Sequence, residues 1–551
     1  MCTHRDDLTD LAKIVTLPYP LLLQKSAREA LNLSLKDHVI IIDEAHNLMD
    51  AITGIYSISV SLTQFQRSRA QLGIYLQKFR NRLKGKNRVY VAQTVRLLDS
   101  LTSYLQDKSS GDEENEGVVH VGDLMAGKGV DQINLYKLMR YLQESKLARK
   151  VDGYTVHTEQ QGRENEAHTS KPVKPKTPQA EKSIPVLTHI QGFLLALMNP
   201  SAEGRFLFTR TDDGATLLRY MLLDPANHFK EIVDDARAVI LAGGTMSPMS
   251  DYTQHLFPYL PASRIVTLSC GHVIPPSNLL AWPVTTAASG APFDFTFEKR
   301  AGAAMMRDLG AALLSFARAI PDGVVVFFPS HAYLDQCVAA WRKEAGAPGS
   351  RTLWAALADV KPVFLESRST APASAAAAAT TTTTPSAGPP SSTAASTLAA
   401  YTSAISAARP PRRGALLLAV TGGTLSEGIN FSDALGRGVG VVGLPFADAR
   451  SAEWRARAAH AAATAATPAL GRAAARARYE NAAMRAVNQC VGRAIRHRGD
   501  YAAILLLDRR YADQRVAGKL PGWIRESLRG AAGVGEVAEG LGEFFRGKEG
   551  V

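Results

Sequence analysis

Residues 39–50, VIIIDEAHNLMD, decide how this chain must fold. Residues 38–42 form an apolar run that ends abruptly at Asp43 and Glu44. Such a run predicts a strand that is buried on both faces of a parallel sheet. In open α/β sheets ligands bind outside the carboxyl ends of the strands, which is where these two carboxylates stand. The stretch therefore predicts an α/β fold with an acidic site at one edge of a sheet.

Five more apolar runs follow the same plan, in which a buried strand leads into a small or polar turn. They are 237–248 (RAVILAGGTMSP), 323–330 (GVVVFFPS), 414–423 (GALLLAVTGG), 438–446 (GVGVVGLPF) and 501–510 (YAAILLLDRR). Stretches with helical spacing of apolar residues alternate with these runs, and 61–150 is one such stretch. Alternating strands and helices predict a mostly parallel sheet.

Two segments lack the composition of a folded core. Residues 155–185 are rich in Pro and Lys and predict a flexible linker. Residues 367–395 consist largely of Ala, Thr, Ser and Pro. They cannot bury enough apolar surface to offset the entropy of ordering, so we expect a disordered insert there.

Charge and cysteine usage restrict the class of protein. The 551 residues carry a net charge of +12, and the last 151 residues contain 22 Lys+Arg against 13 Asp+Glu. A basic C-terminal part is typical of a polyanionic partner such as nucleic acid, although a solvated basic surface would have the same composition. The four cysteines are far apart and predict neither a disulfide framework nor a zinc site. No apolar run is long enough to span a membrane, so we expect no membrane partner.

The acidic turn after the first run has the residues for chemistry on a nucleotide. Asp43 would hold Mg²⁺, usually through water, and Glu44 would polarise the water that attacks a γ-phosphate. His46 would couple the state of the nucleotide to a neighbouring motif. The alternative is an acidic helix N-terminus, which the helix dipole favours without any catalytic role.

Two glycine-rich turns follow other predicted strands. Gly244 and Thr245 could approach a phosphate or a neighbouring motif closely, although a plain strand-to-turn connection would look the same. In TGGTLSEGINFSD (421–433), Gly422 and Gly423 permit a tight path, and backbone N–H groups there could face phosphates. A purely structural turn remains an alternative for both.

The segment NQCVGRAIRH (488–497) is the strongest local signal after the acidic turn. If it is helical, Gln489, Gly492, Arg493 and Arg496 share one face. A glycine that allows close approach and two arginines with forked, permanently charged donors suit a γ-phosphate. The alternative is a solvated basic helix face.

Taken in order, these segments resemble motifs II to VI of superfamily 2 helicases, and in particular the XPD-like group of DEAH iron–sulfur DNA helicases. LPYPLLLQKSARE, DEAHNLMDAITG, SCGHVIPPSN and EGINFSDALGR most resemble the chromosome-loss (ChlR-type) branch, the sister-chromatid-cohesion helicases of fungi and animals. The resemblance extends over nearly the whole chain except 155–185 and 367–395.

The resemblance implies two RecA-like parallel-sheet domains with a helical arch inserted in the first. Residues 1–60 and 186–262 would form an incomplete first domain, 61–185 the arch with its linker, and 263–551 the second domain with the 367–395 insert. It also implies ATP-dependent 5′–3′ unwinding of single-stranded or forked DNA in the nucleus. The implied roles are cohesion, replication and DNA repair, with replication and cohesion proteins as partners.

The same resemblance assigns roles to individual residues. Asp43 and Glu44 match the Mg²⁺ and water pair, and Arg493 and Arg496 match the arginines that reach the γ-phosphate. The positions that match coupling and nucleotide-contacting motifs are His46, Gly244, Thr245, Glu427, Gly428 and Gln489.

The chain departs from the family pattern before Asp43. No GxxxxGK[ST] loop occurs in the 551 residues, and 42 residues precede Asp43. The resemblance implies ATP and Mg²⁺, and it also implies a 4Fe–4S cluster whose four cysteines lie upstream in the family. Here Cys2 alone is near that position, and one thiolate cannot hold a cluster. The chain therefore looks truncated at its N-terminus, and the first sheet should expose strand edges and apolar faces.

Two hypotheses follow from this departure. The chain is either an ATP-dependent DNA helicase by descent that holds half of its ATP site, or a catalytically inactive module that binds nucleic acid or protein partners.

A protein consisting of residues 1–551 alone is expected to hydrolyse ATP at a negligible rate, because no loop in the sequence cradles the β-phosphate. Phosphate release with and without single-stranded DNA measures this. DNA-stimulated hydrolysis that Glu44→Gln abolishes would show that the expectation is wrong.

Overall fold

The computed structural model describes residues 14–83, 85–110, 115–126, 129–155, 185–200, 202–211, 214–343, 351–366, 392–407, 414–427 and 429–548. The chain forms two compact units. Unit 1 comprises 1–36, 47–235 and 448–472, and unit 2 comprises 37–46, 236–447 and 473–551. Each unit therefore contains segments that are far apart in the sequence.

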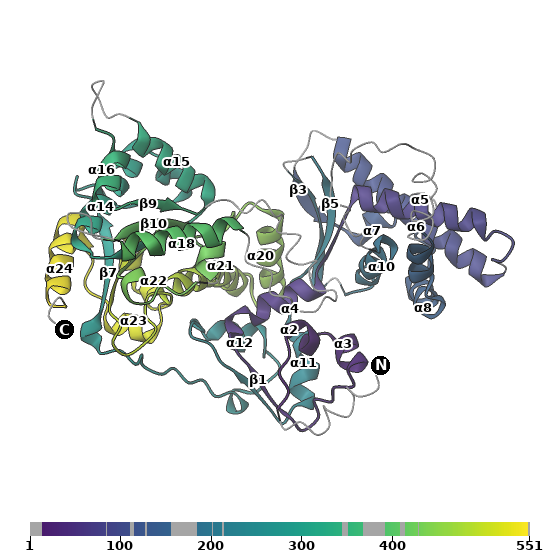
Figure 1. Ribbon diagram of the computed structural model, residues 1–551. Helices are drawn as coiled ribbons and strands as arrows, with labels where there is room; N and C mark the ends of the chain where they lie inside the picture. Colours follow the sequence, from purple (N-terminus) through teal and green to yellow (C-terminus); the bar gives the residue numbers. More distant parts are fainter. Residues whose placement is uncertain are drawn as a thin grey trace. The chain divides into compact units, whose positions relative to one another are not determined.

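A seven-stranded parallel sheet is the framework of unit 2 (Figure 1). Its order is β13-β7-β12-β11-β8-β10-β9, and every neighbouring pair is parallel. The strands are β7 (Leu279–Thr286), β8 (Gly323–Phe328), β9 (Val363–Leu365), β10 (Ala415–Val420), β11 (Gly438–Val442), β12 (Ala502–Leu507) and β13 (Ala532–Gly533). The α/β fold class and four of the predicted strands, β8, β10, β11 and β12, are confirmed.

Alternate side chains of these strands enter two different cores, because successive residues point to opposite faces of a sheet. Val324, Val326 and Phe328 of β8 lie in one core, and Val325 and Phe327 lie in the other. The first core is covered by α14 (Ala303–Ala319), α15 (His331–Arg342), α16 (Leu353–Val360) and α24 (Val534–Arg546). The second is covered by α18 (Ser392–Ser406) and α21 (Pro468–Val491). Burial on both faces explains why these strands read as unbroken apolar runs.

Strand β7 was not predicted from the sequence. Pro283 lies within it, and a proline in an apolar run argues against a central strand because it cannot donate a ladder hydrogen bond. The structure pairs β7 with β12 along its length and with β13 only at Val284 and Thr286. The proline is tolerated because this side of the sheet is nearly an edge.

Unit 1 has a four-stranded antiparallel sheet in the order β2-β5-β4-β3. Its strands are β2 (Ile58–Ser61), β3 (Glu116–Val119), β4 (Gly204–Arg210) and β5 (Thr216–Leu222). Its core is shared with helices α5 (Leu62–Lys78), α6 (Lys86–Ser110), α7 (Val121–Leu124), α8 (Leu135–Ser145) and α10 (Val186–Ala196). Unit 1 also contains helices α2 (Tyr19–Leu23), α3 (Lys25–Ala30), α4 (Leu48–Tyr56), α11 (Ala226–Asp235) and α20 (Ala452–Thr464).

The units divide the chain differently from the expected domains. The segment 61–185 was expected to be helical, but β3 lies within it and pairs with β4. Strands β4 and β5 were expected in the first RecA-like domain, yet they complete the sheet of unit 1. Antiparallel pairing across more than 80 residues leaves no local periodic signal that would fix this boundary. The assignment of two RecA-like domains to stated residue ranges remains a prediction.

The strand before the acidic turn is β1 (Val39–Ile42), and it pairs in parallel with β6 (Ala238–Leu241), the strand predicted at 237–248. Within the described residues these two strands form a sheet of their own. The prediction that β1 is buried on both faces was wrong. Ile40 and Ile42 are buried, whereas Val39 and Ile41 are 51% and 68% exposed. Ile240 of β6 is 48% exposed. The expectation that this sheet exposes apolar side chains is confirmed.

Several predicted features lie outside the described residues. They are Cys2, Gly428, most of the linker 155–185 and most of the insert 367–395. Among the described helices, none combines the length and apolar character needed to cross a lipid bilayer.

Amide hydrogen exchange should be faster in β1 and β6 than in β8 and β10. The two-stranded sheet has few neighbours to hold its hydrogen bonds closed, whereas β8 and β10 are buried at the centre of seven strands. Mass spectrometry of peptides from 38–42 and 323–328 measures the difference. Equal protection of these two peptides would contradict the lower stability predicted for the first sheet.

Candidate nucleotide site

The acidic turn begins where β1 ends. Asp43 and Glu44 form a tight turn, and the Asp43 carboxylate accepts a hydrogen bond from the Glu44 N–H at 2.9 Å. Glu44 has a φ of 48°, in the left-handed region that non-glycine residues seldom adopt. Both carboxylates are exposed, and Glu44 Oε2 lies 3.1 Å from His46 Nδ1. Two exposed oxygen donors at the end of a strand are the ligands Mg²⁺ prefers.

Backbone pairing places the first glycine turn beside the acidic turn. Ala242 N–H donates to Ile42 O, and Ala45 N–H donates to Ala242 O, each at 2.9 Å. The ladder between β1 and β6 thus continues past the strands into both turns. Gly243, Gly244 and Thr245 follow, so this glycine turn begins beside the acidic turn.

Helix α21 packs against this turn at its C-terminal end. A Cβ on Gly492 would lie 3.0 Å from Thr245 Cγ2, so a larger residue there would push the Thr245 side chain by a few tenths of an ångström. The Asn488 side chain, which is fully buried, donates to Ser247 O at 3.2 Å. Nearer the start of the helix, buried Asp251 accepts from Asn481 at 2.6 Å and also from Arg485. These bonds fix the segment 245–251 to α21.

The predicted single helical face is only partly correct. Helix α21 ends at Val491, and Gly492 and Arg493 form a turn. Gly492 N–H still bonds to Asn488 O, but Arg493 N–H bonds to Cys490 O, which tightens the last turn. Arg493 O then accepts from Phe431 N–H, and the chain leaves the helix. Gln489 lies on the helix and is half-buried, whereas Arg496 lies on irregular backbone after the helix has ended. The two residues therefore do not share a helical face.

The glycine-rich turn at 421–427 is organised by a carboxylate that sequence reasoning missed. Glu366 is buried, and its two oxygens accept from Val420 N–H at 2.8 Å and Leu425 N–H at 2.9 Å. The side chain lies so close to the turn that a Cβ on Gly423 would be 2.7 Å from both oxygens.

This arrangement uses several of the N–H groups of the turn within the protein itself. Those of Val420 and Leu425 face Glu366, and those of Thr421, Gly423 and Ser426 bond to backbone carbonyls. Glu427 ends α19 (Thr424–Glu427), but its side chain, like Gly428, is outside what the structure describes.

The two arginines are held by the segment that follows this turn. Arg493 Nε donates to Ser426 O at 3.0 Å, and Arg496 Nη2 donates to Asn430 Oδ1. Arg496 N–H also donates to Asp500 Oδ2 at 3.3 Å. Asn430 and Asp500 therefore set the direction in which the Arg496 side chain leaves the backbone.

Asp500 is the buried centre of this loop. Its Oδ1 accepts from Arg437 at 2.9 Å and from Tyr501 N–H at 3.0 Å, and its Oδ2 accepts from Asp433 N–H at 3.4 Å. One carboxylate thus ties the backbone at 433 to the backbone at 496. A lone aspartate in a loop carries no periodic signal, which is why sequence reasoning passed over it.

Charges of opposite sign converge on Arg496. Burial lowers the pKa of its guanidinium, the positive charge of Arg493 lowers it further, and the negative charge of Glu44 raises it. The acidic turn and the arginine loop are therefore close enough to interact electrostatically. Two neighbouring guanidiniums repel each other, so an anion between them would be bound favourably.

The residues present do not fit an iron–sulfur cluster. The described cysteines are Cys270, which is exposed, and Cys337 and Cys490, which are buried on α15 and α21. Burial raises the pKa of Cys337 to about 12, so its thiol stays protonated and is a poor ligand.

Ligand atoms of Asp433, His497 and Asp500 lie within 4.8 Å of one another. His497 and Asp433 contact each other directly at 2.9 Å, and Asp500 is already bonded to Arg437. The cluster is therefore accounted for by its internal bonds.

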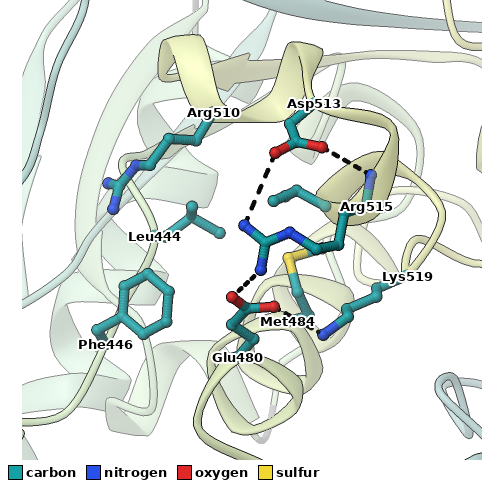
Figure 2. Close-up of a pocket in the computed structure, with 9 residues that line it drawn as sticks. Leu444, Phe446, Glu480, Met484, Arg510, Asp513, Arg515 and Lys519 are labelled. Carbon is teal, nitrogen blue, oxygen red and sulfur yellow. Dashed lines mark hydrogen bonds and ion pairs between the residues drawn. The ribbon is translucent and has the colours of Figure 1, made fainter. Parts of the chain in front are cut away.

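A small pocket beside β11 is distinct from this site (Figure 2). It has a volume of about 60 Å³, which suits a few water molecules and is too small for a nucleotide. Four of its charged side chains are paired with one another: Arg515 and Lys519 both donate to Glu480, and Arg515 also pairs with Asp513. Burial raises the pKa of Glu480, but the bonds from Arg515 and Lys519 outweigh it and the net shift is downward.

Comparison with known proteins agrees with this geometry. Residues 313–527 match the helicase C-terminal domain family, and residues 3–65 match the DEAD_2 family. The ATP-dependent DNA helicase chl1 of Aspergillus clavatus is 52% identical over 526 residues, which are 94% of this chain and 67% of that protein. The chain belongs to the Chl1 family of ATP-dependent DNA helicases. Its Schizosaccharomyces pombe relative is 39% identical over 98% of the chain.

The Chl1-family chain spans about three fifths of the length of most of these relatives. It covers 59% of the Aspergillus niger protein, at 50% identity, and 61% of the S. pombe protein. Among solved structures, S. tokodaii Xpd4 has a TM-score of 0.52 and 16% identity over 93% of this chain and 81% of that chain. This likeness shows that the fold is XPD-like.

Asp500→Asn should destabilise unit 2 by about 3 kcal/mol, because it removes the nearer of the two carboxylates that pair with the largely buried Arg437 guanidinium and leaves only Asp322, at 3.9 Å. Urea unfolding followed by circular dichroism measures the change. Glu543→Gln, on the exposed side of α24, is the control and should stay within about 0.5 kcal/mol of the parent. Equal stability of the two variants would contradict a central role for Asp500.

Proposed function

We propose that this chain contributes the Mg²⁺ and water carboxylates, together with the γ-phosphate arginines, to an ATP-dependent 5′–3′ DNA helicase. The observation that carries the proposal is the packing of Thr245, in the turn that follows the strand paired with β1, against Gly492, the neighbour of Arg493. Support also comes from the relatives, which bear the name ATP-dependent DNA helicase. The substrate would be single-stranded or forked DNA, with ATP as fuel.

Each residue has a distinct task in this proposal. Asp43 would hold Mg²⁺ through water, and Mg²⁺ neutralises charge on the phosphates when it is bound. Glu44 would orient the attacking water. Arg493 and Arg496 would contact the γ-phosphate, with Ser426 O and Asn430 holding their side chains in place. Such arginines act by stabilising charge that develops as the phosphoryl group transfers.

The packing of α21 suggests how hydrolysis would be transmitted. Thr245 contacts Gly492, and Asp251 is bonded to α21 through Asn481 and Arg485. A shift at the acidic turn would therefore move the helix that leads to Arg493. His46, Gly244, Gln489, Glu427 and Gly428 are proposed to take part in this coupling on the basis of the family motifs.

The cellular assignments belong to the proposal as well. A nuclear location and roles in sister-chromatid cohesion, replication and DNA repair, with cohesion proteins as partners, rest on the resemblance to the ChlR-type branch. No step in the proposal involves an iron–sulfur cluster, because the described cysteines do not come together.

The second candidate is a catalytically inactive module that binds nucleic acid or a protein partner. It is favoured by the lack of a GxxxxGK[ST] loop in the 551 residues. The genomic sequence upstream of Met1 discriminates between the two. An open frame that encodes a glycine-rich loop with Lys and Ser or Thr, together with three or four cysteines, favours the helicase, and a stop codon favours the module.

In the protein translated from the whole reading frame, Arg496→Ala should lower the DNA-stimulated ATPase rate by about a thousandfold or more. Glu44→Gln should abolish unwinding of a duplex with a 5′ tail, while Lys343→Gln, at an exposed position just after α15, should leave it unchanged. Strand separation measured by fluorescence tests both variants. Full unwinding by Arg496→Ala would contradict the proposal.

A further inference from the structure

A second concentration of positive charge lies far in the sequence from the basic C-terminal part. Residues 51–98 contain nine Lys and Arg and no Asp or Glu. The run includes the end of α5, the connection, and the start of α6. A stretch of this length with one sign of charge creates a field that attracts polyanions.

The local structure gathers five of these cations at one place. Helix α5 begins at the end of β2 with a capping box between Ser61 and Gln64, and 17 residues of helix extend about 25 Å from the sheet. Its far end and the start of α6 form a hairpin tip in unit 1 (Figure 1). We call this surface the basic tip and define it by Lys78, Arg80, Arg82, Lys86 and Arg88, all of which are exposed.

The acidic side chains that the structure describes do not neutralise the basic tip. Within the part of the chain that the structure describes, none of its five side chains forms an ion pair with an acidic residue. By contrast Arg69, nearer the sheet, pairs with Asp99 at 2.7 Å, and Arg140 pairs with Glu144 at 2.8 Å. Lys86 and Arg88 also occupy the first turn of α6, where the helix dipole disfavours cations. Folding alone gives no reason for this arrangement, whereas an external anion would stabilise it.

Phe79 and Tyr90 are aromatic residues of the same segment as the basic tip, and Tyr136 lies on the helix whose Tyr141 stacks on Tyr90. Tyr90, in the second turn of α6, stacks on Tyr141 of α8 with a centroid distance of 4.7 Å and an interplanar angle of 20°. Phe79 packs on Tyr154 at 5.6 Å, and the Arg82 guanidinium lies 5.9 Å from the Phe79 centroid. At the start of α8, Tyr136 is 71% exposed.

A surface with both cations and an exposed aromatic ring is better suited to single-stranded nucleic acid than to an acidic peptide. Phosphate groups attract the cations, and exposed rings stack with unpaired bases, as in surfaces that bind single strands without sequence preference. An acidic peptide would use the cations but has no need of an exposed tyrosine. The chemistry of the surface therefore favours single-stranded nucleic acid.

We propose that the basic tip and Tyr136 form a binding surface for single-stranded nucleic acid, separate from the nucleotide site. This inference rests on the proposed function in so far as a helicase must hold a strand. Beyond that function, the inference specifies the part of unit 1 that holds the strand and the side chains that contact it.

The test is binding of a fluorescent oligothymidylate to the 551-residue chain, measured by anisotropy over a range of salt concentrations. Replacing Arg80, Arg82, Lys86 and Arg88 by Gln should raise the Kd about tenfold or more. The slope of log K against log salt should fall by roughly 0.7 for each phosphate that the variant leaves without a cation. A matched variant with Arg307, Arg318, Lys343 and Arg546 replaced by Gln removes the same charge from unit 2 and should bind as the parent does.

Two further measurements identify the ligand. Tyr136→Ala should weaken oligothymidylate binding about tenfold and leave binding of an abasic oligonucleotide unchanged, because base stacking alone is removed. Tyr136→Phe should restore it. Equal affinity for polyglutamate and oligothymidylate at the same salt would overturn the assignment to nucleic acid.

Equal affinity of the two quadruple variants, or no binding of oligothymidylate at all, would overturn the basic tip as a site. Neither result would bear on the ATP chemistry, which the Arg496→Ala and Glu44→Gln measurements test on their own. A failure of the surface and a failure of the helicase proposal are therefore distinguishable.

Discussion

The close approach of Gly492 to Thr245 is the contact on which the candidate site depends. It is closest with glycine just after α21, because a side chain there would press on Thr245 Cγ2. With that contact made, Asn488 reaches Ser247 O and the segment 245–251 is fixed to the helix. The acidic turn is linked to the same segment through the hydrogen-bonded pairing of β1 with β6. Asp43, Glu44 and the arginine loop thereby belong to the same compact unit.

Buried carboxylates hold the other half of the site. Glu366 fixes the turn at 420–425 through two backbone N–H groups, and Asp500 joins the backbone at 433 to the backbone at 496. Both use their oxygens on the protein itself and are buried, so they shape the loops rather than meet a ligand. The carboxylates proposed to meet metal and water, Asp43 and Glu44, are exposed. In this unit the buried carboxylates bond to the protein itself, whereas the exposed carboxylates are the ones proposed to take part in catalysis.

Much of the fold could be read from the chain because four of its strands are buried on both faces and appear as unbroken apolar runs. The same rule failed at β1, where the run is equally apolar but Val39 and Ile41 are exposed, since a run cannot show how many strands surround it. Strand β7 was missed because of Pro283. The acidic and arginine motifs were found from their residue types and spacing. Glu366 and Asp500 were not, because their partners are set by tertiary contacts with no local pattern.

The central claim is that Asp43, Glu44, Arg493 and Arg496 surround one triphosphate. Affinity cleavage tests it most directly: Fe²⁺ replaces Mg²⁺ with ATP, and the radicals it generates cut the backbone near the metal. The account predicts cuts both at 43–46 and at 493–496, each suppressed by excess Mg²⁺ and ATP. Cuts confined to 43–46, with 493–496 intact at every nucleotide concentration, would contradict it.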